Sequence, residues 1–88
     1  LKLYISKINI SLRKTILDPQ GKAIEHSLKS LGFEPIVDTR IGKYIELKID
    51  AVSKQEAEKI SEEACKKLLA NPVMEDFTFE VTEIGGTE

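Results

Sequence analysis

The chain has 88 residues, of which 41% are hydrophobic and 32% charged, and its formal net charge is -2. This composition is typical of one small globular domain with a well solvated surface, and the charge gives no global attraction to nucleic acid or to an anionic membrane. No apolar run approaches the roughly 20 residues of a membrane span, and no signal peptide is evident. The single cysteine cannot form an internal disulfide and suits a reducing cytoplasm.

Residues 1–12 are expected to form a long first strand. Apolar residues lie at odd positions up to Ile5 and at even positions from Ile8 onward. A shift of one residue turns side chains to the other face of a sheet. We therefore expect either a bulge near Ser6 and Lys7 or a strand whose two halves face different surfaces.

A first helix is expected to begin after Asp18 and to end near Leu31. Aspartate is a favoured N-cap, and proline, here Pro19, is favoured at the first helical position. Gly32 suits the left-handed residue that follows a helix, and Pro35 prevents continuation. The apolar stripe of this helix consists of Ile24, Leu28 and Leu31.

Residues 36–49 predict a central β-hairpin. Ile45, Leu47 and Ile49 alternate with polar residues, which indicates a half-buried strand. A type II turn with Gly42 at its third position, or a bulge centred on Gly42, fits the corner. Either geometry places Arg40 and Lys43 beside the corner.

Ser53 and Glu56 form a capping-box pattern that opens a second helix. Its expected apolar stripe is Ala57, Ile60, Ala64 and Leu68, joined by Cys65 and Leu69. The helix ends at Asn71-Pro72, and Phe77, Phe79 and Val81 alternate with polar residues in a last strand.

The predicted order is β-α-β-β-α-β, which gives an α+β, ferredoxin-like two-layer sandwich with two helices on one face of an antiparallel sheet. Residues 1–84 form one domain, and residues 85–88 form a flexible tail. A domain of this size buries only roughly 60–65% of its unfolded surface, so pairing with another subunit would stabilise it. The other sheet face carries Tyr44, Glu46, Lys48, Thr78 and Glu80.

No set of residues predicts catalysis. His26 has no identifiable nucleophile or orienting acid beside it, and Cys65 lies on or next to an apolar stripe, as a buried thiol does. Glycine at position 21 is a poor choice in a first helical turn unless a backbone, from a partner or a neighbouring chain, approaches closely. Arg40 and Lys43 are either solvated cations or a pair that docks on a carboxylate or phosphate.

Several functions of this fold lack their motifs. The aromatic run of RNA-recognition domains, the Cys-x-x-Cys of metal chaperones, the cysteine run of ferredoxins and a glycine-rich phosphate loop are all missing from the sequence. What remains is a non-catalytic subunit, a small-ligand regulatory module of the amino-acid-binding kind, or a plain dimerisation module.

Three stretches resemble one known family, PurS, the small subunit of phosphoribosylformylglycinamidine synthase. They are residues 17–21 (LDPQG), 37–47 (VDTRIGKYIEL) and 65–77 (CKKLLANPVMEDF). The resemblance covers nearly the whole chain, although Ser6 stands where the family has an aliphatic residue.

The resemblance implies a role in the fourth step of purine biosynthesis, in an ATP- and glutamine-dependent ligase complex of the cytoplasm. A glutaminase subunit, PurQ, would release ammonia, and a synthetase subunit, PurL, would use ATP and magnesium. This chain would bridge the two, support ammonia transfer, hold no catalytic residue, metal or cofactor of its own, and form strand-exchanged dimers or tetramers.

The expected subunit contacts follow the same three stretches. They are Asp18, Pro19, Gln20, Gly21, Arg40, Gly42, Lys43 and Asn71.

Overall fold

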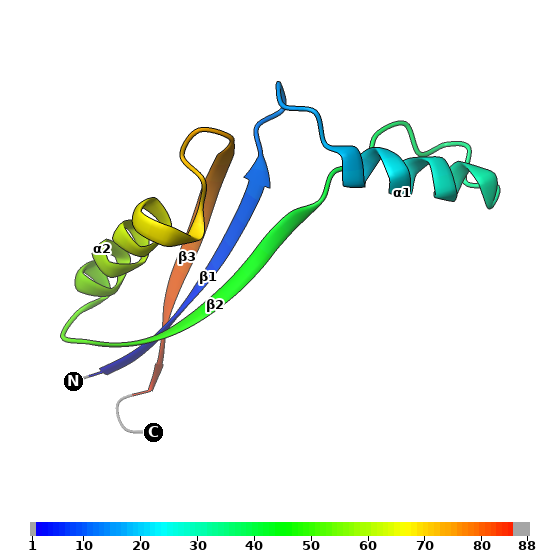
Figure 1. The fold of residues 1–88 in the computed structure, drawn as a ribbon. Helices are drawn as coiled ribbons and strands as arrows, with labels where there is room; N and C mark the ends of the chain where they lie inside the picture. The colour runs from blue at the N-terminus through cyan, green and yellow to red at the C-terminus, as the bar shows by residue number, and fades with distance from the viewer. Residues whose placement is uncertain (1, 86–88) are drawn as a thin grey trace.

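The computed structural model describes residues 2–85 and contains one three-stranded sheet and two helices (Figure 1). In chain order the elements are β1 (Lys2–Leu12), α1 (Pro19–Ser30), β2 (Gly42–Ala51), α2 (Lys54–Ala64), a π-helical turn η1 (Cys65–Leu69) and β3 (Glu75–Gly85). The sheet is antiparallel with the order β2-β1-β3. The α+β class and the antiparallel sheet are therefore confirmed.

β1 lies in the centre of the sheet and keeps a single phase. Tyr4, Ser6, Ile8 and Ile10 are all buried on the face that meets α2. The predicted phase change near Ser6 is wrong, because a serine occupies a core position there and the irregularity in pairing lies between Leu3 and Tyr4. Periodicity of apolar residues alone cannot detect a polar residue in a core.

α2 covers this face of the sheet through residues spaced by four. Ala57, Ser61 and Cys65 are fully buried, whereas Ile60 and Leu68 from the predicted stripe are exposed. The predicted stripe was therefore rotated, again because a buried serine does not count as apolar. The capping box is present: the Ser53 hydroxyl accepts from the Glu56 amide at 3.2 Å.

α1 does not cover the sheet. It stands beyond the ends of β1 and β2 on a projecting segment, residues 13–41, which we call the arm (Figure 1). The extents of the chain are accordingly 51 × 27 × 14 Å. The prediction that both helices lie on one face is wrong within this chain, although Asp18 caps α1 and Gly32 is left-handed with φ 102°, as expected.

The predicted hairpin is also wrong within the chain, because residues 36–41 form no strand and β2 begins at Gly42. A type II turn would need a positive φ at Gly42, and the described glycines with positive φ are only Gly32 and Gly85. Instead, Gly42 lies close to the backbone of β1, and a Cβ there would approach the Ile10 carbonyl oxygen within 2.6 Å. The chain therefore enters β2 directly from the arm.

The face of the sheet opposite α2 is polar, as predicted, and Tyr44, Glu46, Lys48, Thr78 and Glu80 are exposed on it. Gly85 is the last residue of β3, and the rest of the predicted tail lies outside the described residues. None of the helices within residues 2–85 is long and apolar enough to cross a membrane.

Two buried hydroxyls connect β1 with α2. Ser61 Oγ lies 2.7 Å from Ser6 Oγ and 2.8 Å from the Ala57 carbonyl oxygen, and both serines are fully buried. Since a carbonyl only accepts, the single proton of Ser61 goes to Ala57, and Ser6 donates to Ser61.

Replacing one partner of this pair should cost more than replacing both. Ser61→Ala leaves the Ser6 hydroxyl buried without an acceptor, which costs about 1–3 kcal/mol of unfolding free energy. Ser6→Ala/Ser61→Ala removes the unsatisfied group and should be less destabilised than the sum of the single variants. Urea unfolding at equal protein concentration measures both, and strictly additive losses would contradict the pairing.

Cys65 should be unreactive in the folded protein. Its side chain is fully buried, and burial raises the pKa of its thiol, so the reactive thiolate is disfavoured. Labelling by a thiol reagent should be slow in buffer and fast in denaturant. Rapid native labelling would contradict the packing of η1 against the sheet.

Candidate functional site

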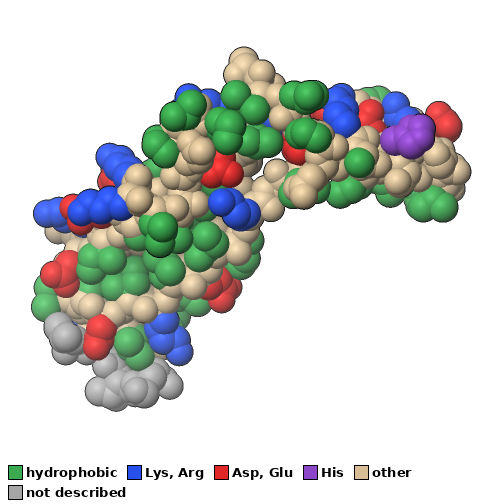
Figure 2. All heavy atoms as spheres, viewed as in Figure 1, with side chains coloured by type: hydrophobic (Ala, Val, Ile, Leu, Met, Phe, Trp, Pro, Cys, Tyr) green, Lys and Arg blue, Asp and Glu red, His purple; other side chains and the backbone are tan. Residues whose placement is uncertain are grey.

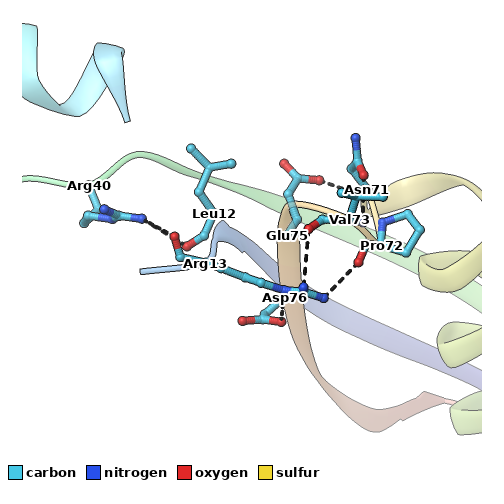
Figure 3. Close-up of polar contacts among 8 residues, drawn as sticks. All are labelled: Leu12, Arg13, Arg40, Asn71, Pro72, Val73, Glu75 and Asp76. Carbon is cyan, nitrogen blue, oxygen red and sulfur yellow. Dashed lines mark hydrogen bonds and ion pairs between the residues drawn. The ribbon is translucent and has the colours of Figure 1, made fainter. Parts of the chain in front are cut away.

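The eight residues expected to contact other subunits gather at one end of the sheet, at the base of the arm. This end is where β1 finishes, β2 and β3 begin, and the arm departs (Figures 1 and 3). A hollow of about 210 Å³ lies there. It is lined by Ile10, Leu12, Asp18, Gln20, Ile41, Gly42, Lys43 and Glu75. Tertiary structure thus brings together residues from three separate stretches of the sequence.

Asp18 ties the beginning of α1 to the far end of the arm. One carboxylate oxygen accepts from the Gly21 amide at 2.9 Å, as an N-cap does, and the other accepts from the Ile41 amide at 2.9 Å. The side chain is buried, with the residue only 4% exposed. We call this pair of hydrogen bonds the Asp18 clasp.

The Asp18 clasp favours the ionised carboxylate. Hydrogen bonds from the Ile41 and Gly21 amides, together with the charge of Arg40, hold the pKa of Asp18 below its usual value of 3.8. A lowered folded pKa means that this stabilisation is complete above the unfolded pKa and is lost as the pH falls through the folded one. The clasp is therefore fully formed at neutral pH.

Gly21 is required by the close approach of the arm's own backbone. A Cβ at this position would lie 2.3 Å from the Thr39 carbonyl oxygen and 2.9 Å from Asp18 Oδ2. The sequence indicated that some backbone approaches Gly21, and within this chain it is residue 39. Pro19 and Gln20, in contrast, are exposed.

Arg40 and Lys43 are exposed but engaged within the chain. The Nη2 of Arg40 donates to the carbonyl oxygens of Leu12, Arg13 and Ile16 at 2.8–3.4 Å. Lys43 Nζ lies 3.3 Å from the Leu69 carbonyl oxygen and 3.7 Å from Glu75. They therefore stabilise the end of the sheet, and their surface position leaves them accessible to a partner.

Asn71 and Arg13 shape the turn between η1 and β3. The side-chain Oδ1 of Asn71 accepts from the Val73 backbone amide, and the backbone amide of Asn71 donates to Glu75 Oε1. Arg13 donates to the Pro72 and Val73 carbonyl oxygens and to Asp76 (Figure 3). No local motif marks Arg13 as part of this site, because only the antiparallel pairing of β1 with β3 places it beside the turn.

The charged side chains at this end of the sheet hold backbone segments in place. Asp18, Arg40 and Lys43 bind backbone groups, and no three metal-binding side chains cluster within the described part of the chain. The arrangement fixes the directions of three segments around a hollow that is lined by both apolar and charged side chains. Such a surface suits binding to another macromolecule.

Comparison with known proteins agrees with the resemblance in the sequence. A family model described as PurS, phosphoribosylformylglycinamidine (FGAM) synthase, matches residues 5–83. The PurS subunit of phosphoribosylformylglycinamidine synthase from Bacillus subtilis is 44% identical over 82 residues, which are 93% of this chain and 96% of that protein.

Solved structures extend the similarity to three dimensions. B. subtilis PurS has a TM-score of 0.82 at 45% identity, covering 91% of this chain and 99% of that one. A chain of the Thermotoga maritima structure named PurLQS has a TM-score of 0.83 at 36% identity, covering 96% of this chain and all of that one. The chain therefore belongs to the PurS family, whose members are the small subunits of FGAM synthase in purine biosynthesis.

Proposed function

We propose that this subunit bridges the glutaminase and synthetase subunits of the synthase and supports the transfer of ammonia between them. The observation that carries the proposal is the gathering of residues from three stretches around one hollow at the end of the sheet. These side chains do not pair a nucleophile with a general base. They surround a hollow lined by both apolar and charged residues, as in many protein–protein interfaces.

The proposed partners are the glutaminase PurQ and the synthetase PurL. The T. maritima structure named PurLQS supports this choice, because its name joins two further subunits with PurS. In the proposed division of labour, ATP and magnesium are used by the synthetase and glutamine by the glutaminase. The small subunit contributes geometry and no cofactor.

A second copy of this chain is a further proposed partner. The arm exposes Leu31, Phe33 and Val37, and hydrophobic side chains are visible along it in Figure 2. The sheet has apolar surface and an edge that such an arm could cover. α2 leaves Ile45 and Phe77 only partly buried, and β2 is an edge strand of the sheet. An exchanged arm would supply the partner with the missing helix and with an extended strand from residues 36–41.

We also propose a cytoplasmic location. The buried, unpaired Cys65 is consistent with a reducing compartment.

Removing the two cations on either side of Gly42, Arg40 and Lys43, should impair glutamine-dependent synthesis. Losing a charge that is desolvated against a partner carboxylate costs roughly 2–5 kcal/mol of binding. Arg40→Ala/Lys43→Ala should fold and dimerise, since both side chains are exposed and the Asp18 clasp still holds the arm, but should assemble poorly with the glutaminase and synthetase. Activity with glutamine should fall, and synthetase activity with free ammonia should persist.

Lys54→Ala/Lys59→Ala is the matched control, because both lysines are exposed on α2 and lie away from the hollow and from the polar sheet face. This variant should behave as the parent does. If Arg40→Ala/Lys43→Ala supports glutamine-dependent turnover as well as the parent at limiting subunit concentration, the two cations do not dock on a partner. The contact surface would then be the exposed Pro19 and Gln20 or the polar sheet face.

The isolated chain should be at least a dimer. Light scattering at micromolar concentration should give a mass of two or more chains of 9.9 kDa. Leu31→Asp/Phe33→Asp should shift the mass toward one chain, because burying unpaired carboxylates on the arm is costly. Leu68→Asp, on the exposed side of η1, is the control and should leave the mass unchanged. A monomeric parent would refute the exchange.

A further inference from the structure

The arm is attached to the sheet through two backbone segments, neither of them a β-strand, that lie side by side. One leaves the end of β1 at residue 13, and the other returns to β2 at residue 41. No other helix or strand of the described chain packs extensively against α1. The direction of the arm is therefore decided where these two segments meet.

Three sets of contacts join the segments at that point. The Asp18 clasp bonds the returning Ile41 amide at 2.9 Å, and Gly21 allows the Thr39 carbonyl to lie against the first turn of α1. Arg40 reaches from the returning segment to the carbonyl oxygens of the departing one, the shortest of these distances being 2.8 Å. Asp18 and Gly21 are both buried at the centre of this arrangement.

We propose that Asp18 and Gly21 are positioning residues, which fix the direction of the arm before any second chain binds and promote assembly without touching the partner. This inference rests on the proposed function and revises the part that these two residues play in it. Both were expected to contact another subunit, but both are buried, and Asp18 reaches the hollow with only 4% of its surface exposed.

The benefit to assembly is pre-organisation. A projecting helix that swings on two backbone segments samples many directions, and binding must then restrict it to one. A clasp that has already selected this direction removes the ordering cost from the binding step. Its loss should therefore weaken every interaction that uses the arm, whichever partner makes it.

Asp18→Asn is the sharpest substitution, because its shape is nearly unchanged. Asparagine has one acceptor oxygen, and its amide nitrogen would face one of the two N–H donors that the carboxylate now accepts. Gly21→Ala perturbs the same point from the other side, because its Cβ would collide with the Thr39 carbonyl oxygen and displace it.

Two controls separate this effect from general damage. His26→Ala changes an exposed side chain on α1 that neither lines the hollow nor takes part in the clasp. Ser27→Gly replaces an exposed residue in the middle of α1 and lowers the stability of the helix, because glycine disfavours the helical backbone. It leaves the base of the arm intact.

The experiment combines two measurements on the full chain. Amide hydrogen exchange followed by NMR reports whether Ile41 remains bonded, and it needs no other subunit. Sedimentation gives the dissociation constant of the homodimer and of the complex with the glutaminase and synthetase. Asp18→Asn and Gly21→Ala should each accelerate Ile41 exchange and weaken assembly, both at least tenfold, whereas the controls should keep parental exchange at Ile41 and assemble as the parent does.

Two results would overturn the proposal. If Asp18→Asn weakens assembly while Ile41 exchanges as in the parent, Asp18 touches the partner directly. If Ile41 is released while assembly is unchanged, the direction of the arm does not matter. Failure of the chain to bind the two enzymes at all would count against the proposed function instead, since the exchange measurement stands without them.

Discussion

The structure depends on one buried carboxylate that joins two distant points of the chain. Asp18 caps the first helix through the Gly21 amide and holds the return of the chain through the Ile41 amide. A buried charge is costly unless it is fully hydrogen bonded, so its presence indicates that both donors must be in place together. This one side chain therefore couples a local feature, a helix cap, to the entry angle of β2.

The arm and the exposed core are two sides of the same constraint. A chain of 88 residues has little apolar surface to bury, and this one covers its sheet with a single helix. Sending α1 away from the sheet leaves Phe77, Phe79 and Ile45 half covered and exposes Leu31 and Phe33 on the arm. A second chain that exchanged its arm would bury both surfaces, and this is the physical basis of the proposed self-association.

The side chains at the end of the sheet hold its shape through hydrogen bonds to the backbone. Arg13, Arg40 and Lys43 bind backbone carbonyls, and Glu75 accepts from the Asn71 amide, so the turn before β3 and the base of the arm hold fixed shapes. Exposed ion pairs contribute little to stability on average, with values of about 0–1 kcal/mol. The contribution of these side chains is to geometry, because they hold the turn before β3 and the base of the arm in place beside the hollow.

Local signals in the sequence determined the caps, the boundaries of most elements and the family. Asp18-Pro19, Ser53 with Glu56, and Gly32 each have a geometric meaning that a few neighbouring residues decide, and the structure confirms all three. The expected site residues could also be named from the sequence, because their motifs are local.

The sequence could not decide features that depend on contacts between distant segments. Ser6 and Ser61 satisfy each other in the core, so polarity misled the phase of β1 and of α2. Residues 36–41 have the composition of a strand, yet a strand needs a partner, and the Asp18 clasp directs this segment along the arm where its own sheet offers none. Arg13 joined the site only when β1 paired with β3. Tertiary structure decided these points because hydrogen-bond partners, unlike caps and turns, are chosen across the fold.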